Sequence, residues 1–183
     1  MDTKQLNKLK KRVYKIAKEH SLVGETDTFY LGLIMSEMGE AIKAAQNGKY
    51  TNVKEYKIYI AKGLSPKVGF KKYIKNSIED KIADIVIMLL DFAVMKEYEL
   101  AITQQEHDIA TNFLSTIDKY TLSGFFFYLI GFLFEAFDMG FLAIGVNNAI
   151  CILSDCFKKI TNSDEDLWWF VSKKMTYNEL YGV

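Results

Sequence analysis

The segment DTFYLGLIMSEMGEAIKAAQ, residues 27–46, carries the pattern that decides the fold class. Its apolar residues recur three and four positions apart, which predicts an α-helix with one buried face. That face comprises Leu31, Ile34, Met38, Ala41, Ile42 and Ala45. Thr26 or Asp27 supplies the N-terminal cap and Asn47-Gly48 supplies the stop signal, so the helix is expected to end at Gln46.

The rest of the chain extends this helical pattern to an all-α fold. Pro66 is the only proline, and the alternation typical of strands is scarce. Further helices are predicted over residues 3–20, 52–61, 70–98, 102–119, 122–139, 141–160 and 165–178. We expect a single all-α domain over residues 1–183, a helical bundle with an acid-bearing half (1–98), a second half (99–160) and a C-terminal helix (164–178).

Composition narrows the partners that the chain is expected to bind. Its 23 basic and 23 acidic side chains balance, which argues against nucleic acid or an anionic membrane as the main partner. Arg12 is the only Arg, so contacts to phosphate fall to Lys, backbone amides or a metal. The longest uncharged runs, Tyr120–Phe134 and Met139–Ser154, are shorter than the roughly 18 residues of a membrane span.

Cysteine usage and the start of the chain predict a cytoplasmic location. Cys151 and Cys156 lie five positions apart in an apolar stretch, which is typical of core residues in a reducing compartment. The polar, Lys-rich first residues differ from a signal peptide. No paired Cys/His pattern occurs, which argues against a zinc site.

Isolated carboxylates on two predicted helices indicate a cation site. Glu37 and Glu40 lie at the margin of the apolar face described above, while Asp80, Asp84 and Asp91 share an arc of about 40° on the next long helix. Buried like charges lose hydration and repel one another, so either a cation lies among them or the acids face water. Mg²⁺, or Mn²⁺ in its place, suits oxygen ligands without His.

These acids resemble the motif of the MazG-like, all-α nucleotide pyrophosphohydrolases, which is EExxE on one helix and ExxD on the next. The segment SEMGEA, residues 36–41, resembles the first element. The segment IEDKIADIVI, residues 78–87, resembles the second, with Asp91 seven positions beyond Asp84. The segment WWFVSKKMTYN, residues 168–178, is similar to a tail that helps to hold the nucleotide in some members.

The resemblance implies a MazG-like helical bundle that acts as a homodimer on a small-molecule nucleotide. It implies Mg²⁺-dependent hydrolysis of a nucleoside triphosphate to a nucleoside monophosphate and pyrophosphate, in housecleaning of the nucleotide pool. Glu37, Glu40 and Asp84 would hold the metal and be the catalytic residues, with Asp80 as a stand-in ligand. Asp91 would support the metal or position the attacking water.

The tail and two departures from the motif complete the expected site. The resemblance implies that Lys174, Tyr177 and Asn178 contact the nucleotide. Ser36 replaces the first Glu of EExxE, and Lys81 replaces the Glu of ExxD. Lys81 could contact a phosphate directly as a point charge, or it could weaken the metal site. Two alternatives therefore stay open: a nucleotide-binding protein with little turnover, and a purely structural helical dimer.

The second half of the chain echoes the first. Glu135 and Asp138 lie 98 positions after Glu37 and Glu40. One interpretation is a degenerate duplication of a helical hairpin, in which Glu135 and Asp138 complete the site. The other is coincidence between two helices rich in Phe and Leu.

Two further features have alternative interpretations. Residues 49–75 carry eight Lys and one Glu, and this insert is either a basic lid over the phosphates or a solvated surface segment. The aromatic residues Trp168, Trp169, Phe170 and Tyr177 either stack on a base or dock the C-terminal helix on the core. The Phe residues of 125–137 are expected in the core or at a dimer seam.

Overall fold

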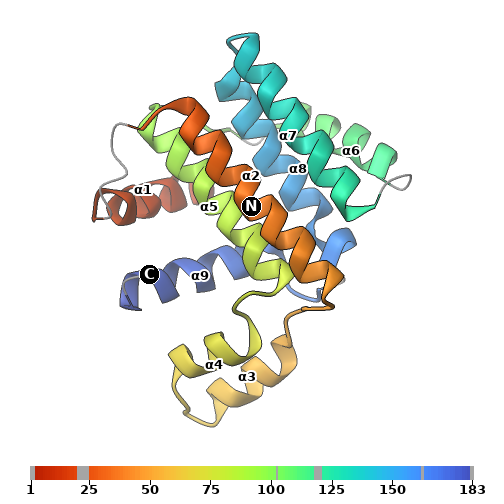
Figure 1. Cartoon of the computed structure of the whole chain (residues 1–183). Helices are drawn as coiled ribbons and strands as arrows, with labels where there is room; N and C mark the ends of the chain where they lie inside the picture. The colour runs from red at the N-terminus through yellow and green to blue at the C-terminus, as the bar shows by residue number, and fades with distance from the viewer. Residues whose placement is uncertain (1–2, 20–24, 102, 118–120, 162, 182–183) are drawn as a thin grey trace.

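The computed structural model describes residues 3–19, 25–101, 103–117, 121–161 and 163–181 (Figure 1). The regular secondary structure in these ranges is entirely α-helical, which confirms the expected fold class. The helices are α1 (Thr3–Glu19), α2 (Asp27–Gln46), α3 (Val53–Ala61), α4 (Pro66–Tyr73), α5 (Ile78–Met95), α6 (Gln104–Ile117), α7 (Leu122–Asp138), α8 (Leu142–Thr161) and α9 (Leu167–Tyr181). The predicted helix ends at residues 20, 102 and 119 lie outside the described residues.

Helix α2 has the predicted bounds, but the predicted helix over 70–98 is wrong in its first part. The helical conformation is interrupted between α4 and α5, where Asn76 adopts a left-handed φ of 63°. Ser77 then caps α5, because its Oγ accepts a hydrogen bond from the Asp80 amide at 3.1 Å. Asn tolerates the left-handed region and Ser is a favoured N-cap, so a new helix begins here.

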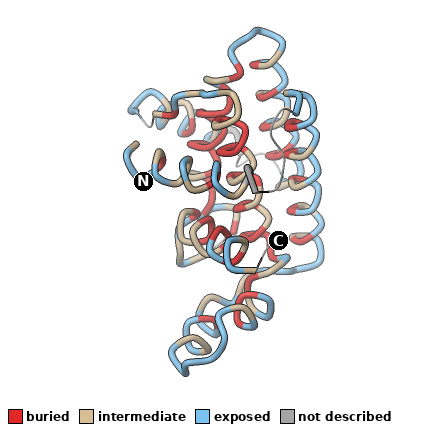
Figure 2. The backbone as a smooth tube through the Cα atoms, turned by 90° about the vertical axis from the view of Figure 1, so that its left-hand side faces the viewer, coloured by how far each residue is buried: buried red, intermediate tan, exposed pale blue. Residues whose placement is uncertain are grey.

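Helices α5 and α8 carry the longest sets of buried residues among the described helices, and Figure 2 shows the buried segments gathered inside the molecule. Every residue of α8 from Gly145 to Leu153 is buried. α7 approaches α8 so closely that a Cβ atom at Gly145 would lie 2.6 Å from the Cβ of Ala136. The buried side chains of both halves of the chain belong to one hydrophobic core.

Cys151 and Cys156 are free thiols in this core, in agreement with the sequence analysis. Burial raises the pKa of each thiol to about 12, because the thiolate would lose its hydration there. Both thiols are therefore inert side chains that pack like small apolar residues. Among the described helices, none combines the length and the apolar character needed to cross a membrane.

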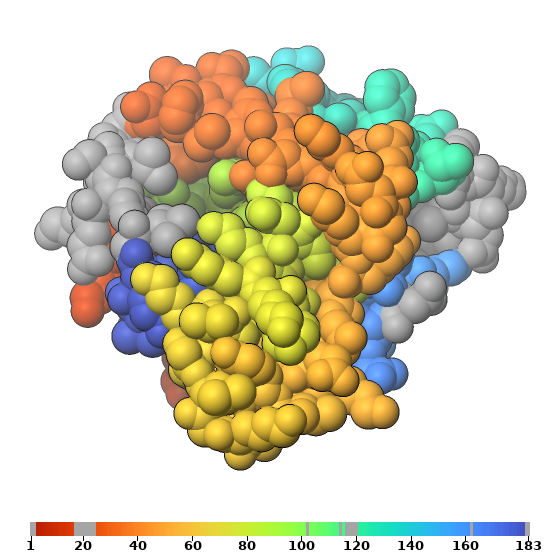
Figure 3. All heavy atoms as spheres, turned by 60° about the horizontal axis from the view of Figure 1, so that its bottom comes forward, coloured from red at the N-terminus to blue at the C-terminus, as the bar shows by residue number. Residues whose placement is uncertain are grey.

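The Lys-rich insert forms a hairpin of α3 and α4 that projects from the body (Figures 2 and 3). Its root rests on α9 through aromatic contacts. Tyr56 meets Trp169 edge to face with ring centroids 5.8 Å apart, and Phe70 stacks on Tyr177 at 4.4 Å. Trp168 donates a hydrogen bond to Ser154 Oγ at 3.0 Å. These contacts dock α9 on the body, which is the second of the two interpretations given to the aromatic group.

The two helix pairs of the proposed duplication each pack as neighbours, α2 against α5 and α7 against α8. They lie in one bundle, in which α2 also packs on α7 and α5 on α8. A degenerate duplication requires this arrangement but is not the only origin that yields it. The duplication therefore stays a prediction.

Candidate functional site

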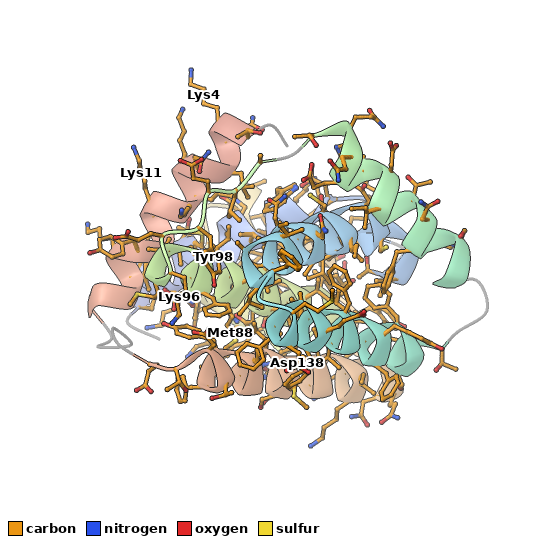
Figure 4. All side chains as sticks on the ribbon, turned by 90° about the horizontal axis from the view of Figure 1, so that it is seen from above. Lys4, Lys11, Met88, Lys96, Tyr98 and Asp138 are labelled. Atoms are coloured by element: carbon orange, nitrogen blue, oxygen red, sulfur yellow. The ribbon has the colours of Figure 1, made fainter. Side chains whose placement is uncertain are left out.

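Antiparallel packing of α2 on α5 brings the predicted acids together. At one end Lys96, the C-cap residue of α5, forms an ion pair with Asp27 at the start of α2; Lys96 is labelled in Figure 4. At the other end Lys81 of α5 contacts Glu37 and Glu40 in the second half of α2. This register places Glu37 and Glu40 opposite the first turns of α5, where Asp80 and Asp84 lie.

Lys81 lies between the two acid-bearing helices. Its Nζ atom is 3.2 Å from Glu37 Oε2, contacts Glu40 Oε2 and is 3.9 Å from Asp84 Oδ2. The Lys81 side chain is only 12% exposed, whereas that of Glu40 is 52% exposed. The single ammonium group is thus shared by three carboxylates and compensates part of their charge.

A second ammonium reaches the cluster from the C-terminal helix α9. Lys174 is buried, and its Nζ donates to Asp80 Oδ1 at 3.0 Å and to Asp84 Oδ2 at 2.9 Å. Asp80 is held from the other side, because its Oδ2 accepts a hydrogen bond from the Asn76 amide at 2.8 Å. We call Glu37, Glu40, Asp80, Asp84, Lys81 and Lys174 the acid–lysine cluster.

Burial changes the titration of the acid–lysine cluster. It raises the pKa of Asp84 to about 7, because lost hydration and the carboxylates of Asp80 and Glu37 outweigh the Lys174 ammonium. Burial lowers the pKa values of Lys81 and Lys174, but their carboxylate partners outweigh it and hold both values above the usual range. The hydrogen bond from Lys81 lowers the pKa of Glu40.

Lys81 and Lys174 thus supply the positive charge that the sequence analysis assigned to a metal. No group of three or more His, Cys, Asp or Glu side chains within the described ranges is arranged to hold a metal ion. The four carboxylates are hard oxygen donors and suit Mg²⁺ in their chemistry. A metal ion bound among them would take the place of at least one ammonium group.

A polar cleft of about 290 Å³ adjoins the exposed side of the cluster. It lies where the end of α2 and the start of α5 meet, beside the hairpin in Figure 3. Its lining comprises Glu40, Lys43, Ala44, Asn47, Lys49, Asn76 and Lys81. The lining has three ammonium groups, from Lys43, Lys49 and Lys81, and one carboxylate, from Glu40. The cleft is therefore suited to an anionic group such as phosphate. The sequence analysis did not single out Lys43 or Lys49.

The structure separates the three tail residues that were expected to contact a nucleotide. Lys174 belongs to the acid–lysine cluster, as shown above. Tyr177 is only 4% exposed and its ring stacks on Phe70, so the ring is part of the core. The Oδ1 atom of Asn178 is buried without a hydrogen-bond partner among the described residues. Most buried polar atoms in proteins have a hydrogen-bond partner, so this oxygen is available to accept one.

Asp91 lies outside the cluster, two helical turns beyond Asp84 on α5. It forms no ion pair with a residue in the described part of the chain, and its Oδ1 atom is buried without a hydrogen-bond partner there. Burial raises the pKa of Asp91 to about 6. The structure therefore does not bring Asp91 together with the acids that it was expected to support.

Asp91→Asn is expected to raise the free energy of unfolding by about 2 kcal/mol at pH 8, because a buried charge is removed. Burial raises the folded-state pKa of Asp91, so the wild type loses stability as the pH rises from about 4 through 6. The advantage of the variant should therefore disappear near pH 4. Urea unfolding at both pH values measures it, with the exposed Asp164→Asn as control. An equal difference at both pH values would contradict this account.

Glu135 and Asp138 do not join the acid–lysine cluster. Both are exposed, and they lie in the last turns of α7, which ends at the top of Figure 1. The start of α5 lies toward the bottom of the same view. Asp138, labelled in Figure 4, thus belongs to the opposite end of the bundle. The hypothesis that the second-half acids complete the site is wrong for this structure.

Glu79 is a buried acid that the sequence analysis did not assign. It is 2% exposed, and its Oε2 accepts hydrogen bonds from the amide and the hydroxyl of Thr51 at 3.0 and 3.1 Å. Burial raises the pKa of Glu79. These bonds attach Thr51, in the segment that follows α2, to the first turn of α5. Glu79 thereby helps to position the neighbouring Asp80 of the cluster. Its place beside Asp80 is the only sequence signal that could have indicated it.

Comparison of the chain with protein-family models, with curated proteins and with solved structures found no match. Assignment of a function therefore depends on the motif resemblance and on the geometry of the acid–lysine cluster.

Proposed function

We propose that the chain binds a nucleoside triphosphate together with Mg²⁺ and hydrolyses it to a nucleoside monophosphate and pyrophosphate. The observation that carries this proposal is the convergence of Glu37, Glu40, Asp80 and Asp84 from two antiparallel helices. The adjoining cleft with Lys43 and its neighbours supports it, because a polyphosphate needs positive charge close to the metal ligands.

In the proposed complex the carboxylates of the cluster hold Mg²⁺, with Mn²⁺ as a substitute. Mg²⁺ neutralises charge on the phosphates and orients them. Lys81 lies between the cluster and the cleft, so it can exchange a carboxylate partner for a phosphate oxygen. Lys174 donates hydrogen bonds to Asp80 and Asp84 and so holds both carboxyl groups in place beside the proposed metal position. Glu37 is partly buried and lies next to Lys81, which lines the cleft, and it is the residue proposed to accept a proton from the attacking water.

A second candidate is a protein that binds nucleotide with little turnover. It is favoured by the position of Lys81, whose ammonium contacts Glu37 and Glu40 and lies near Asp84. In that case Lys81 permanently replaces a metal ion, and the cleft binds the phosphates without hydrolysis. The third candidate, a purely structural helical dimer, predicts no response to metal or nucleotide.

Thermal unfolding with Mg²⁺ and non-hydrolysable nucleoside triphosphate analogues tests the proposal. A melting temperature that rises only when metal and nucleotide are both present indicates a substrate site by linkage. Product analysis by chromatography then separates the first two candidates, since only the enzyme releases monophosphate and pyrophosphate. If no analogue, whatever its nucleobase, changes the melting temperature, the purely structural candidate is the one that remains.

Glu37→Gln is expected to lower turnover at least about 100-fold, because the amide neither accepts the proton nor carries the charge that binds metal. Steady-state kinetics with Mg²⁺ measures this effect, and circular dichroism checks that the fold is retained. Glu55→Gln is the matched control, since Glu55 is exposed on the hairpin. Full activity of Glu37→Gln would remove Glu37 from the mechanism.

The homodimer and the cytoplasmic location expected from the sequence stay predictions.

A further inference from the structure

The α3–α4 hairpin carries a strong local excess of positive charge. Residues 49–75 contain eight Lys and one Glu, a formal charge of +7, and because the whole chain is neutral the remaining residues carry −7. The hairpin projects from the body in Figures 1 and 2, so a surface that approaches its tip meets these lysines before the body. At physiological ionic strength charges are screened beyond about 8 Å. The neutrality of the whole chain therefore does not describe a contact at the tip.

Both helices of the hairpin combine lysine with an aliphatic residue on the exposed side. On α3 the exposed positions recur three and four residues apart, which places them on one helix face, whereas Tyr56 is buried. On α4 the exposed positions follow the same spacing, whereas Phe70 is buried. Every residue of the tip, 61–66, is exposed. We call the exposed lysines and large aliphatic residues of the hairpin its outer residues: Lys54, Lys57, Ile58, Lys62, Leu64, Val68, Lys71 and Lys72.

Close packing within the hairpin fixes the position of the outer residues. α3 approaches α4 so closely that a Cβ atom at Gly69 would lie 3.0 Å from the Cδ1 atom of Tyr59. The Asn52 amide donates a hydrogen bond to the carbonyl oxygen of Tyr73 at 3.1 Å, which joins the two ends of the hairpin. The aromatic contacts described above hold its root on α9. The hairpin is therefore a folded unit that presents its outer residues in a fixed arrangement.

We propose that the tip of the α3–α4 hairpin docks on the surface of an anionic lipid bilayer. Each lysine near such a surface strengthens binding about fivefold, because its ammonium group is attracted to the negative headgroups. Leu64 is 44% exposed at the tip and Val68, four positions later, is 49% exposed, so both can enter the boundary between headgroups and acyl chains. None of the outer residues lines the cleft beside the acid–lysine cluster, so this contact is independent of nucleotide hydrolysis.

A nucleic acid fits the outer residues less well than a lipid surface does. Arg12 of α1 is the only Arg of the chain, so the hairpin lacks the planar fork that binds phosphate through two hydrogen bonds. Tyr50 is the one exposed aromatic residue of the fully described segment 49–75, whereas proteins that bind single strands stack bases on several aromatic rings. A phosphate backbone would also leave Leu64 and Val68 in water. The aliphatic residues therefore favour the bilayer.

Flotation of the full chain with lipid vesicles tests the proposal. Phosphatidylcholine vesicles with roughly 30% phosphatidylserine should bind the wild type at least about 25-fold more tightly than phosphatidylcholine alone, and added NaCl should weaken this binding. Lys71→Glu combined with Lys72→Glu should weaken it about 25-fold or more, because two cations at the lipid surface become anions. Leu64→Gln should weaken it about fivefold, because less apolar surface is buried. Circular dichroism checks that each variant is folded.

Lys8→Glu combined with Lys11→Glu is the matched control. Both residues are exposed on α1, the other Lys-rich helix, so the change in net charge is the same. Tyr14 is the only large apolar side chain exposed among the described residues of α1, which therefore lacks the aliphatic residues of the hairpin. Control binding within about twofold of the wild type, with both hairpin variants weakened, would support the proposal.

Four other outcomes would overturn the proposal. A wild type that does not float with phosphatidylserine vesicles has no affinity for the anionic surface. An equal loss of binding in the α1 control would mean that overall charge, and not the hairpin, drives the association. Unchanged binding of Leu64→Gln would exclude insertion of the tip. Binding of mixed-sequence RNA or DNA in place of vesicles, lost when Lys71 and Lys72 are replaced, would assign the lysines to nucleic acid.

Discussion

Lys174→Met is expected to lower the free energy of unfolding by about 3–4 kcal/mol at pH 8. The Lys174 ammonium is the buried partner of Asp80 and Asp84, at 3.0 and 2.9 Å. Met has a similar length and no charge, so the variant retains the packing but leaves both carboxylates without this cation. Asp80 is 1% exposed and cannot regain its hydration while the protein stays folded.

The loss should be smaller at pH 5 than at pH 8. Burial raises the pKa of Asp84 to about 7, so at pH 5 its carboxyl group carries a proton and no longer needs a cation. Denaturant unfolding at the two pH values measures the difference. Lys173→Met is the matched control, because Lys173 lies beside Lys174 on α9 and its Nζ lies over the ring of Trp169, 5.5 Å from the centroid, with no ion pair to a described residue. We expect this control to change stability by less than about 1 kcal/mol.

Addition of Asp84→Asn to Lys174→Met provides a second check. Lys174→Met leaves the carboxylates of Asp80 and Asp84 without their cation, and Asp84→Asn removes one of the two. The double variant should therefore recover part of the stability lost in Lys174→Met, since Lys174 and Asp84 interact directly. An equal loss at pH 5 and pH 8, together with no recovery in the double variant, would show that Lys174 contributes packing instead of charge compensation.

The sequence predicted the fold well where local signals agree with one another. In α2 the apolar spacing, the Thr26 cap and the Asn47-Gly48 stop all indicate the same helix, and its bounds are confirmed. Near residue 76 the apolar pattern of the sequence continues without interruption, although Asn76 is left-handed and Ser77 caps a new helix. Periodicity alone therefore predicted one helix where the structure has two.

The candidate site shows which information the periodicity of the sequence lacks. Helical periodicity placed Glu37, Glu40 and Asp84 on the correct helix faces, and the structure brings them together. It could not identify Lys174 as a counter-ion of Asp80, because the two residues are 94 positions apart and meet only through the packing of α9. The position of Lys81 inside the cluster was likewise open, since a Lys at a motif position predicts neither its rotamer nor its partners.

Lys81→Glu is expected to destabilise the metal-free protein by about 4 kcal/mol and to create a strong response to Mg²⁺. The substitution restores the ExxD element of the motif. It removes the ammonium near Glu37, Glu40 and Asp84 and adds a fourth carboxylate among them. Without metal these carboxylates repel one another, so the folded state is destabilised. With metal it supplies oxygen ligands, so Mg²⁺ at about 100 times its Kd should restore about 2.7 kcal/mol.

Lys81→Met separates loss of the ammonium from gain of a ligand. It removes the same positive charge but adds no oxygen donor, so Mg²⁺ should restore less stability than in Lys81→Glu. Unfolding of both variants with Mg²⁺ or with EDTA measures the two effects. An equal response of the two variants to Mg²⁺ would mean that the metal binds elsewhere. No response in either would mean that these carboxylates serve only to pair with lysine, and nucleotide hydrolysis at this site would lose its chemical basis.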